Sequence, residues 1–308
     1  MKRLKVAVVG VGYLGEFHAK KYAALPDADL IGVVDINKKR CLKIAREVGC
    51  LPYTDYREIL DAVDAVSIAV PTTLHGEIAI PFLEKGVAVL LEKPMTTSLD
   101  EAYDVISAAE AGRGLLQIGH LERFNPAILA LFGSIKRPMF IEAHRISPFK
   151  KRSADVDVIL DLMIHDIDII LSLVGSKIVS IEAVGVPVLT EQIDIANARL
   201  RFESGCIANI TASRVSVDTM RKIRIFQPDS YISIDYAKKA VDIYKLSDDK
   251  QIVHENVKIS DTDALEAEVR AFVDAVRFNK RPVVDGIAGL SSIKVANLIK
   301  ENMIVPER

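Results

Sequence analysis

The sequence predicts a two-domain α/β protein. A doubly wound parallel sheet forms the N-terminal domain, and an α+β domain with a large, predominantly antiparallel open sheet follows. In the first part of the chain, short apolar runs alternate with segments of helical composition. After Gly119, strand-like runs follow one another with few helices between them. With 308 residues, the chain also exceeds a typical single domain, so we expect domains at 1–119 and 120–308.

Composition and charge argue against several classes of protein. Forty basic and 42 acidic residues give a net charge of −2, which provides no general attraction to nucleic acid or to an anionic membrane. Cys41, Cys50 and Cys206 are well separated and form no CxxC pair, so we expect neither disulfides nor a metal site. The first apolar run leads into glycines rather than a cleavage site, and no later run could span a membrane. We expect a cytoplasmic protein.

The elements of the first domain follow from apolar runs that end in glycine or polar residues. Buried strands are expected at 5–9, 30–34, 65–70, 88–91 and 115–119. Helices are expected at 16–24, 38–48, 56–60, 76–85 and 99–111. Alternation of strands and helices predicts a parallel sheet with right-handed crossovers.

A glycine motif, GVGYLG at residues 10–15, lies between the first strand and the first helix. Gly10 would make the tight turn, Gly12 would let the backbone approach a pyrophosphate, and Gly15 would allow close helix packing. Asp35 ends the second strand, where a carboxylate accepts hydrogen bonds from ribose hydroxyls. Because strand, helix and acid coincide, we predict a Rossmann domain that binds a dinucleotide.

Asp35 also indicates which dinucleotide is bound. A carboxylate at this position would repel the 2′-phosphate of NADP, so we expect NAD. Lys38, Lys39 and Arg40 lie close behind and weaken this inference, although they also suit a solvated helix start.

Two further segments are typical of one family. Glu92-Lys93-Pro94 follows a buried strand, and Asp161 and His165 form a D-x-x-x-H pair in the second domain. Together with the glycine motif, AVPTTLH at 69–75 and RPVVDGIAGL at 281–290, they resemble the Gfo/Idh/MocA family of glucose–fructose oxidoreductases and inositol dehydrogenases. The resemblance covers nearly the whole chain and implies an NAD-dependent oxidoreductase.

The resemblance implies that Lys93, Asp161 and His165 line the catalytic cleft. The residues themselves agree, because Lys93 lies at the carboxyl end of a parallel strand, where open α/β sheets bind ligands. Asp161 and His165 are four residues apart and so neighbours on one helix face. With Asp168 and Ser172 they form a polar stripe, which could alternatively be an ordinary helix surface. We expect His165 to accept a hydroxyl proton, Asp161 to orient it, and Lys93 to bind the same oxygen.

The candidate contacts fall into two sets. The expected cofactor contacts are Gly10, Gly12, Tyr13, Leu14, Gly15, Asp35, Val70, Pro71, Thr72, His75, Glu92 and Lys93. The expected substrate contacts are Lys93, Arg123, Asn125, Arg145, Asp161 and His165. His120 lies at the expected domain junction, as a ligand or as a hinge residue bonded to backbone.

In the second domain, strands are expected at 139–146, 179–188, 197–202, 208–214, 222–226, 231–235, 241–246 and 252–257. Ser204 and Gly205 form a hairpin turn, and helices at 264–278 and 286–302 close the chain. We expect the helix bearing His165 to cover one face of the sheet. In the family the other face often joins subunits, which implies a homodimer or homotetramer.

The segment GHLERFNPA at 119–127 resembles the nucleotide-sugar branch of the family. That resemblance implies oxidation of the C3 hydroxyl of a UDP-N-acetylhexosamine, such as UDP-GlcNAc, to a ketone. An inositol, polyol or free-sugar dehydrogenase is the enzymatic alternative. A non-catalytic NAD-sensing regulator is an alternative of another class, but the presence of Lys93, Asp161 and His165 together argues against it.

Overall fold

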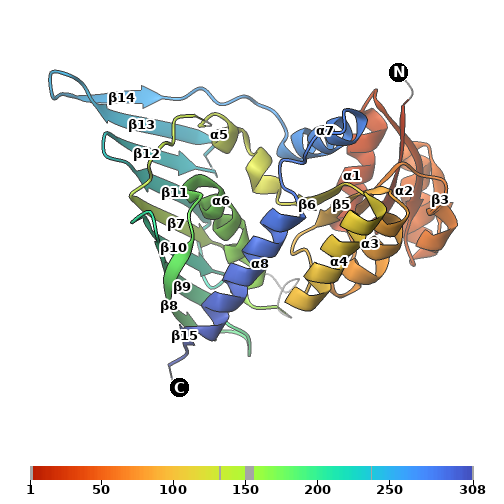
Figure 1. Cartoon of the computed structure of the whole chain (residues 1–308), viewed down its shortest axis with the longest axis horizontal. Coiled ribbons are helices and arrows are strands. Elements are labelled where there is room, and N and C mark those ends of the chain that lie inside the picture. The colour runs from red at the N-terminus through yellow and green to blue at the C-terminus, as the bar shows by residue number, and fades with distance from the viewer. Residues whose placement is uncertain (1–2, 132, 150–155, 237, 307–308) are drawn as a thin grey trace. The chain divides into compact units, whose positions relative to one another are not determined.

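The computed structural model describes residues 3–131, 133–149, 156–236 and 238–306 (Figure 1). The chain forms two compact units, one of Met1–Phe124 with Thr262–Leu290 and one of Asn125–Asp261 with Ser291–Arg308. Each predicted domain was one continuous stretch of the chain, whereas in the structure residues 262–290 belong to the first unit. The physical reason is α7 (Ala264–Arg277), whose residues Val269, Phe272 and Val273 pack into the core of the first sheet.

The first unit is built on a six-stranded sheet with the order β3-β2-β1-β4-β5-β6. Every strand pair is parallel, which confirms the predicted Rossmann arrangement. The strands are β1 (Leu4–Val9), β2 (Ala28–Val34), β3 (Leu51–Tyr53), β4 (Ala65–Ile68), β5 (Ala88–Glu92) and β6 (Leu116–Gly119). The three-residue β3 contains a proline and was not predicted.

Helices connect these strands close to the predicted positions. They are α1 (Tyr13–Ala24), α2 (Lys38–Val48), α3 (His75–Glu84) and α4 (Leu99–Gly112), and 3-10 turns occupy Tyr56–Ile59, Thr72–Leu74 and Leu121–Phe124. The strand order reverses direction between β1 and β4. Open α/β sheets bind ligands at the carboxyl ends of the strands beside such a reversal, which is where the glycine motif lies.

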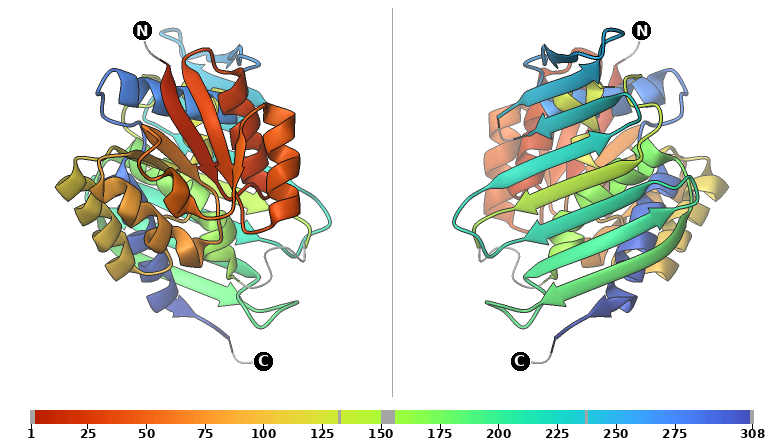
Figure 2. Two further views of the ribbon diagram at one scale, coloured as in Figure 1. Left: turned by 90° about the vertical axis from the view of Figure 1, so that its right-hand side faces the viewer. Right: turned by 90° about the vertical axis from the view of Figure 1, so that its left-hand side faces the viewer.

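The second unit contains a nine-stranded sheet with the order β14-β13-β12-β11-β7-β10-β9-β8-β15 (Figure 2). Its strands are β7 (Phe140–Ile146), β8 (Ile178–Val186), β9 (Ile195–Phe202), β10 (Ile207–Ser213), β11 (Met220–Phe226), β12 (Ser230–Asp235), β13 (Ala240–Leu246), β14 (Ile252–Asn256) and β15 (Met303–Ile304). All pairs are antiparallel except β7 with β10 and β8 with β15. This confirms the predicted sheet, although β15 was not predicted and β7 lies between two meanders.

One face of this sheet is covered by α6 (Ile164–Val174), which continues from a π-helical turn at Ile159–Met163. Buried residues of the helix, such as Ile167 and Ile170, pack with inward-facing strand residues in one core. The short α5 (Pro126–Leu129) and the end of α8 (Gly286–Glu301) join the same core. The opposite face, turned toward the viewer in the right-hand view of Figure 2, carries no helix of the described residues.

Aromatic side chains form a row across that helix-free face. Phe140, Phe226, Tyr231, Tyr244 and His254 lie opposite one another on β7, β11, β12, β13 and β14. Consecutive rings have centroids 4.6–5.6 Å apart. Such cross-strand pairs stabilise a sheet and also present a continuous aromatic surface.

In the described part of the chain, no helix is both long and apolar enough to cross a membrane.

Candidate functional site

Two of the three motif glycines are required by the chain's own packing. Gly10 has a φ of +83°, and a Cβ there would lie 2.6 Å from the carbonyl oxygen of Ala69. A Cβ on Gly15 would overlap the carbonyl oxygen of Gly10. These positions therefore explain the tight turn and the close approach of α1, as the sequence predicted.

Gly12 is different, because no contact with the described residues requires a glycine there. An added Cβ would meet only Nη1 of Arg40, at 3.7 Å, and the φ of −68° suits any residue. Gly12 is the N-cap of α1, and no side chain of the described part of the chain caps that helix end. The open approach and the N–H groups of the helix end suit a pyrophosphate, so the residues present fit a dinucleotide.

Asp35 follows β2 and is held in a fixed orientation. Its Oδ2 accepts a hydrogen bond from the backbone N–H of Val11 at 3.1 Å, and its Oδ1 accepts one from Asn37 at 2.8 Å. Nη1 of Arg40 lies 3.3 Å from Oδ2. A carboxylate fixed beside the glycine loop suits the ribose diol of NAD, and Arg40 offsets part of its charge.

His75 connects the loops that follow β4 and β5. The ring is buried, with Nδ1 3.0 Å from the carbonyl of Pro94 and Nε2 3.1 Å from that of Val70. Burial lowers the pKa of His75, although these carbonyls oppose the shift. The sequence predicted a cofactor contact, but both nitrogens face the chain's own carbonyls. We therefore regard His75 as a residue that positions the two loops.

Lys93 lies directly after β5 and is half-buried, and its backbone N–H donates to Oε2 of Glu92 at 3.3 Å. The peptide bond between Lys93 and Pro94 is cis. Val70, Pro71 and Thr72 follow the neighbouring β4 and are half-buried or exposed. The predicted strand-end residues thus gather at the edge where a doubly wound sheet binds its ligand.

In the second unit, Asp161 lies in the π-helical turn and His165 in the first turn of α6, and both are half-buried. They belong to one continuous helical segment, as the sequence predicted. The N-terminus of this segment is capped by Asp157, whose Oδ1 accepts hydrogen bonds from the N–H groups of Ile159 and Leu160 at 3.1 and 2.9 Å. Single π turns inside helices frequently occur at functional sites.

The other two residues of the predicted polar stripe differ, because Asp168 is buried and Ser172 is exposed. Asp168 is 1% exposed, and the hydroxyl of Ser292 lies 3.5 Å from its Oδ1. The hydroxyl of Ser172 donates to the carbonyl of Ile169 at 2.6 Å. The alternative of an ordinary solvated helix face therefore does not describe Asp168.

Arg145 on β7 has a partner inside its own unit. Its Nε and Nη2 donate to the two carboxylate oxygens of Asp166, at 2.8 and 3.0 Å, and both side chains are buried. Such a bidentate pair fastens α6 to the sheet. The sequence predicted Arg145 as a substrate contact and did not single out Asp166. Because these donors are engaged, we do not include Arg145 in the proposed site.

The segment at 120–125 carries the other predicted substrate contacts. His120 is buried, and its carbonyl accepts a hydrogen bond from the N–H of Arg123 at 2.9 Å. Arg123 is half-buried in the 3-10 turn. Oδ1 of Asn125 accepts from the N–H of Ala127 at 3.0 Å and so caps α5.

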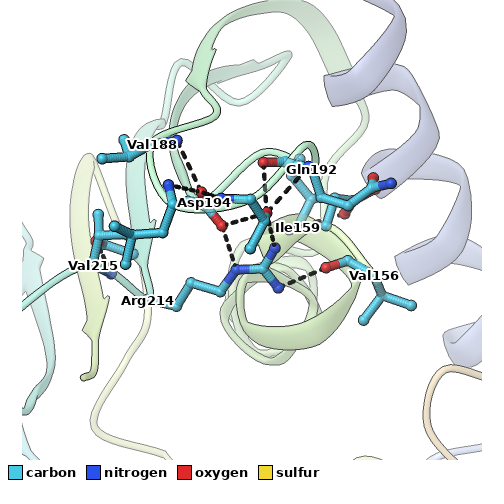
Figure 3. Close-up of polar contacts among 11 residues, drawn as sticks. Val156, Ile159, Val188, Gln192, Asp194, Arg214 and Val215 are labelled. Carbon is cyan, nitrogen blue, oxygen red and sulfur yellow. Dashed lines mark hydrogen bonds and ion pairs between the residues drawn. The ribbon is translucent and has the colours of Figure 1, made fainter. Parts of the chain in front are cut away.

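Sequence reasoning missed a second buried ion pair, formed by Arg214 and Asp194 (Figure 3). Nη1 of Arg214 also donates to the carbonyl of Val156 at 2.6 Å, just before the helix that carries Asp161. Oδ2 of Asp194 accepts three backbone N–H groups of residues 188–190 at 2.6–2.8 Å. Burial opposes ionisation, but the N–H of Thr190 and the Arg214 guanidinium hold the pKa of Asp194 well below its usual range.

Comparison with known proteins agrees with this architecture. Residues 4–120 match the family described as an oxidoreductase family with an NAD-binding Rossmann fold. Residues 132–229 match the Gfo/Idh/MocA C-terminal domain.

Curated relatives and solved structures extend the match to nearly the full length. The chain is 40% identical to a UDP-N-acetylglucosamine 3-dehydrogenase of Acidithiobacillus ferrooxidans, over 94% of each chain. A solved structure of that enzyme covers 98% of each chain, with a TM-score of 0.93 and 38% identity. A scyllo-inositol 2-dehydrogenase of Bacillus subtilis is 32% identical over 70% of this chain and 68% of its own length.

A levoglucosan dehydrogenase in complex with NADH and L-sorbose shares the fold, with a TM-score of 0.88, 20% identity and coverage of 97% and 96%. The glycine loop, the Glu92-Lys93-Pro94 strand end and the helix bearing Asp161 and His165 thus occur in a chain that matches one family over both of its parts. The protein belongs to the Gfo/Idh/MocA family of NAD-binding oxidoreductases.

Proposed function

We propose that the protein uses NAD to oxidise the C3 hydroxyl of a UDP-N-acetylhexosamine, UDP-GlcNAc, to a ketone. The observation that carries this proposal is the 40% identity to the Acidithiobacillus ferrooxidans enzyme over 94% of both chains. This chain also has Lys93, Asp161 and His165 together, which supports an active enzyme rather than a regulator that only senses NAD.

The proposed mechanism assigns one task to each of these side chains. The ammonium of Lys93 binds the oxygen of the reacting hydroxyl and stabilises the negative charge that develops on it. His165 accepts the hydroxyl proton, and Asp161 orients the imidazole for that transfer. NAD, when bound, supplies the hydride acceptor. The protein contributes the positions of these groups and their electrostatic field.

Cofactor contacts are proposed for the glycine loop and the strand ends. The proposed set is Gly10, Gly12, Tyr13, Leu14, Gly15, Asp35, Val70, Pro71, Thr72, Glu92 and Lys93. For the nucleotide part of the substrate we propose Arg123, because a guanidinium pairs well with a diphosphate. Asn125 is proposed as a further substrate contact through the part of its amide that does not cap α5.

The substrate is tested by trapping the product. The protein is incubated with UDP-GlcNAc, NAD, glutamate and an aminotransferase that accepts a 3-keto sugar, and the amino-sugar product is sought by mass spectrometry. Trapping is needed because ketone formation with NAD is usually uphill. The inositol dehydrogenase relatives favour a second candidate, a polyol dehydrogenase. Robust NADH formation from myo-inositol with no amino-sugar product would select that candidate.

We further propose a homo-oligomer that uses the helix-free face of the nine-stranded sheet. The aromatic row from Phe140 to His254 supports this, because side chains of this kind are enriched at interfaces between subunits. Light scattering should report a dimer or tetramer, and Tyr231→Glu should shift the oligomeric state toward monomer.

The three cysteines are free thiols, which suits a reducing compartment such as the cytoplasm, where we propose that the enzyme works.

A further inference from the structure

Three titratable side chains meet inside the first unit, beside the strand end that carries Lys93. His18 comes from α1, Glu92 from β5 and Glu268 from α7, and they are 1%, 8% and 0% exposed. Each offers one nitrogen or oxygen atom, and these atoms all lie within 4.8 Å of one another. Buried ionisable groups are rare unless they are paired, so this cluster needs a chemical explanation.

Two members of the cluster have clear partners. Nε2 of His18 lies 3.0 Å from Oε1 of Glu92, and Nδ1 lies 3.3 Å from Oγ of Ser67. The hydroxyl of Tyr22 is 2.8 Å from the same Oγ. Oε2 of Glu92 accepts the backbone N–H of Lys93 at 3.3 Å. Both oxygens of Glu92 are therefore engaged, which suits an ionised carboxylate.

Glu268 has no such support. Neither of its carboxylate oxygens has a hydrogen-bond partner among the described residues, and its side chain is wholly buried. An ionised carboxylate in that position would lose its hydration without compensation and would face a second negative charge on Glu92. Burial and the charge of Glu92 raise the pKa of Glu268 well above its usual range.

We propose that Glu268 is a buried proton-binding site: in the folded protein it remains a neutral carboxylic acid beside the carboxylate of Glu92. The proton comes from solvent when the chain folds, and no bond other than O–H forms or breaks. The titratable groups around the pair in the described residues include His18 and Tyr22 of α1 and His75 of α3, with Lys93 adjacent to Glu92. Burial raises the pKa of Tyr22, so this hydroxyl stays neutral.

The protonation of Glu268 also affects how Lys93 is positioned. This part of the inference rests on the catalytic role proposed for Lys93. Glu92 precedes Lys93 directly, and its carboxylate accepts the Lys93 N–H. Loss of the proton would place two negative charges within one buried cluster, and their repulsion would displace Glu92. Glu268 is therefore a positioning residue for the strand end. Glu268→Gln, a neutral side chain of the same shape, should preserve that arrangement.

Infrared spectroscopy tests the protonation directly. At neutral pH the wild type should show the carbonyl stretch of a buried carboxylic acid, and Glu268→Gln should lack it. Glu266→Gln is the matched control, because Glu266 lies on the same helix with its side chain 44% exposed. That variant should keep the band. Absence of the band from the wild type, or its survival in Glu268→Gln, would overturn the proposal.

Unfolding by urea gives a second readout. Because the folded pKa of Glu268 is raised, the native state keeps a proton that the unfolded chain releases above the ordinary glutamate pKa of 4.5. The stability from this group is complete below that pH and falls as pH rises through the folded pKa. From pH 5 upward, the folding equilibrium constant of the wild type should therefore fall relative to Glu268→Gln, by up to about tenfold per pH unit. A ratio that does not change with pH would contradict the proposal.

The same three ligand atoms could alternatively hold a divalent cation. Metal analysis of the purified protein separates the two cases. We expect no stoichiometric metal that depends on Glu268, and one metal per chain that is lost in Glu268→Gln would overturn the proton assignment. The infrared, unfolding and metal measurements use no substrate, so their failure is distinct from failure of the proposed function. If Glu268→Gln does not fold, the infrared band of the wild type must still weaken as pH rises.

Discussion

Arg214 pairs with Asp194 through a 2.7 Å contact between Nε and Oδ1, and both side chains are buried. The same guanidinium donates to the carbonyl of Val156, three residues before the π-helical turn that carries Asp161. The pair therefore joins the loop at 187–193 and the end of β10 to the start of the candidate catalytic helix. A buried ion pair adds little net stability by itself, but removal of one partner leaves an uncompensated charge.

Arg214→Met should lower the free energy of unfolding by about 3–5 kcal/mol, because Asp194 would then be buried without its cation. Urea denaturation at pH 7 measures this. The control is Arg46→Met on α2, where the arginine is exposed and the change should be within about 0.5 kcal/mol. Equal stability of the two variants would show that the Arg214–Asp194 pair does not contribute to the stability of the fold.

Asp194 should also make stability depend on acidic pH. Its pKa is depressed in the folded state, so its contribution is present above the unfolded pKa, about 4. That contribution is lost as pH falls further toward the folded pKa. The stability difference between the wild type and Asp194→Asn should therefore shrink between pH 5 and pH 2. A difference that stays constant over this range would contradict the assignment.

The motif glycines should respond differently to a methyl group. Gly15→Ala should lower stability by about 1–3 kcal/mol or more, because its Cβ would overlap the carbonyl of Gly10. Gly12→Ala should leave stability unchanged, since the nearest atom is 3.7 Å away, and should weaken NAD binding by about tenfold. Thermal unfolding and calorimetry measure the two effects. Full NAD affinity in Gly12→Ala would place the pyrophosphate elsewhere.

Cofactor choice should depend on Asp35. The wild type should bind NAD more tightly than NADP, and Asp35→Ala should erode that preference, because the carboxylate is fixed beside the glycine loop. Arg40→Ala serves as the comparison, since it removes the cation that offsets this charge. Equal or tighter binding of NADP by the wild type, measured by calorimetry, would be incompatible with this assignment.

The first unit was largely predictable because its signals are local. Glycine spacing, Asp35 at a strand end and Lys93 after a buried run can each be identified within a few residues, and the parallel order follows from the alternation. The three-residue β3 and the two-residue β15 gave no such signal. The packing of α7 on the first unit was not predicted. The position of α7 late in the chain suggests the second unit, and its apolar face shows that it is buried but not against which sheet.

Buried polar partners could not be predicted for a related reason. In the sequence, Asp166 cannot be distinguished from any other acidic residue on a helix. Its partner Arg145 lies on β7, and only the fold brings the two side chains together. Glu268 likewise meets Glu92 only because α7 packs on a sheet whose strands end far earlier in the sequence. Pairs that are distant in sequence are set by topology, and a single sequence does not show which polar residue faces which.

The central claim is tested most directly by NADH formation, measured by absorbance, with UDP-GlcNAc as substrate in the presence of the trapping aminotransferase. The wild type should turn over UDP-GlcNAc far faster than free N-acetylglucosamine or myo-inositol. Lys93→Met and His165→Ala should each lower kcat by roughly 10²–10⁴-fold. NAD affinity should change little, because neither side chain is needed to bind the pyrophosphate. No NADH from UDP-GlcNAc, or wild-type turnover in both variants, would contradict the account.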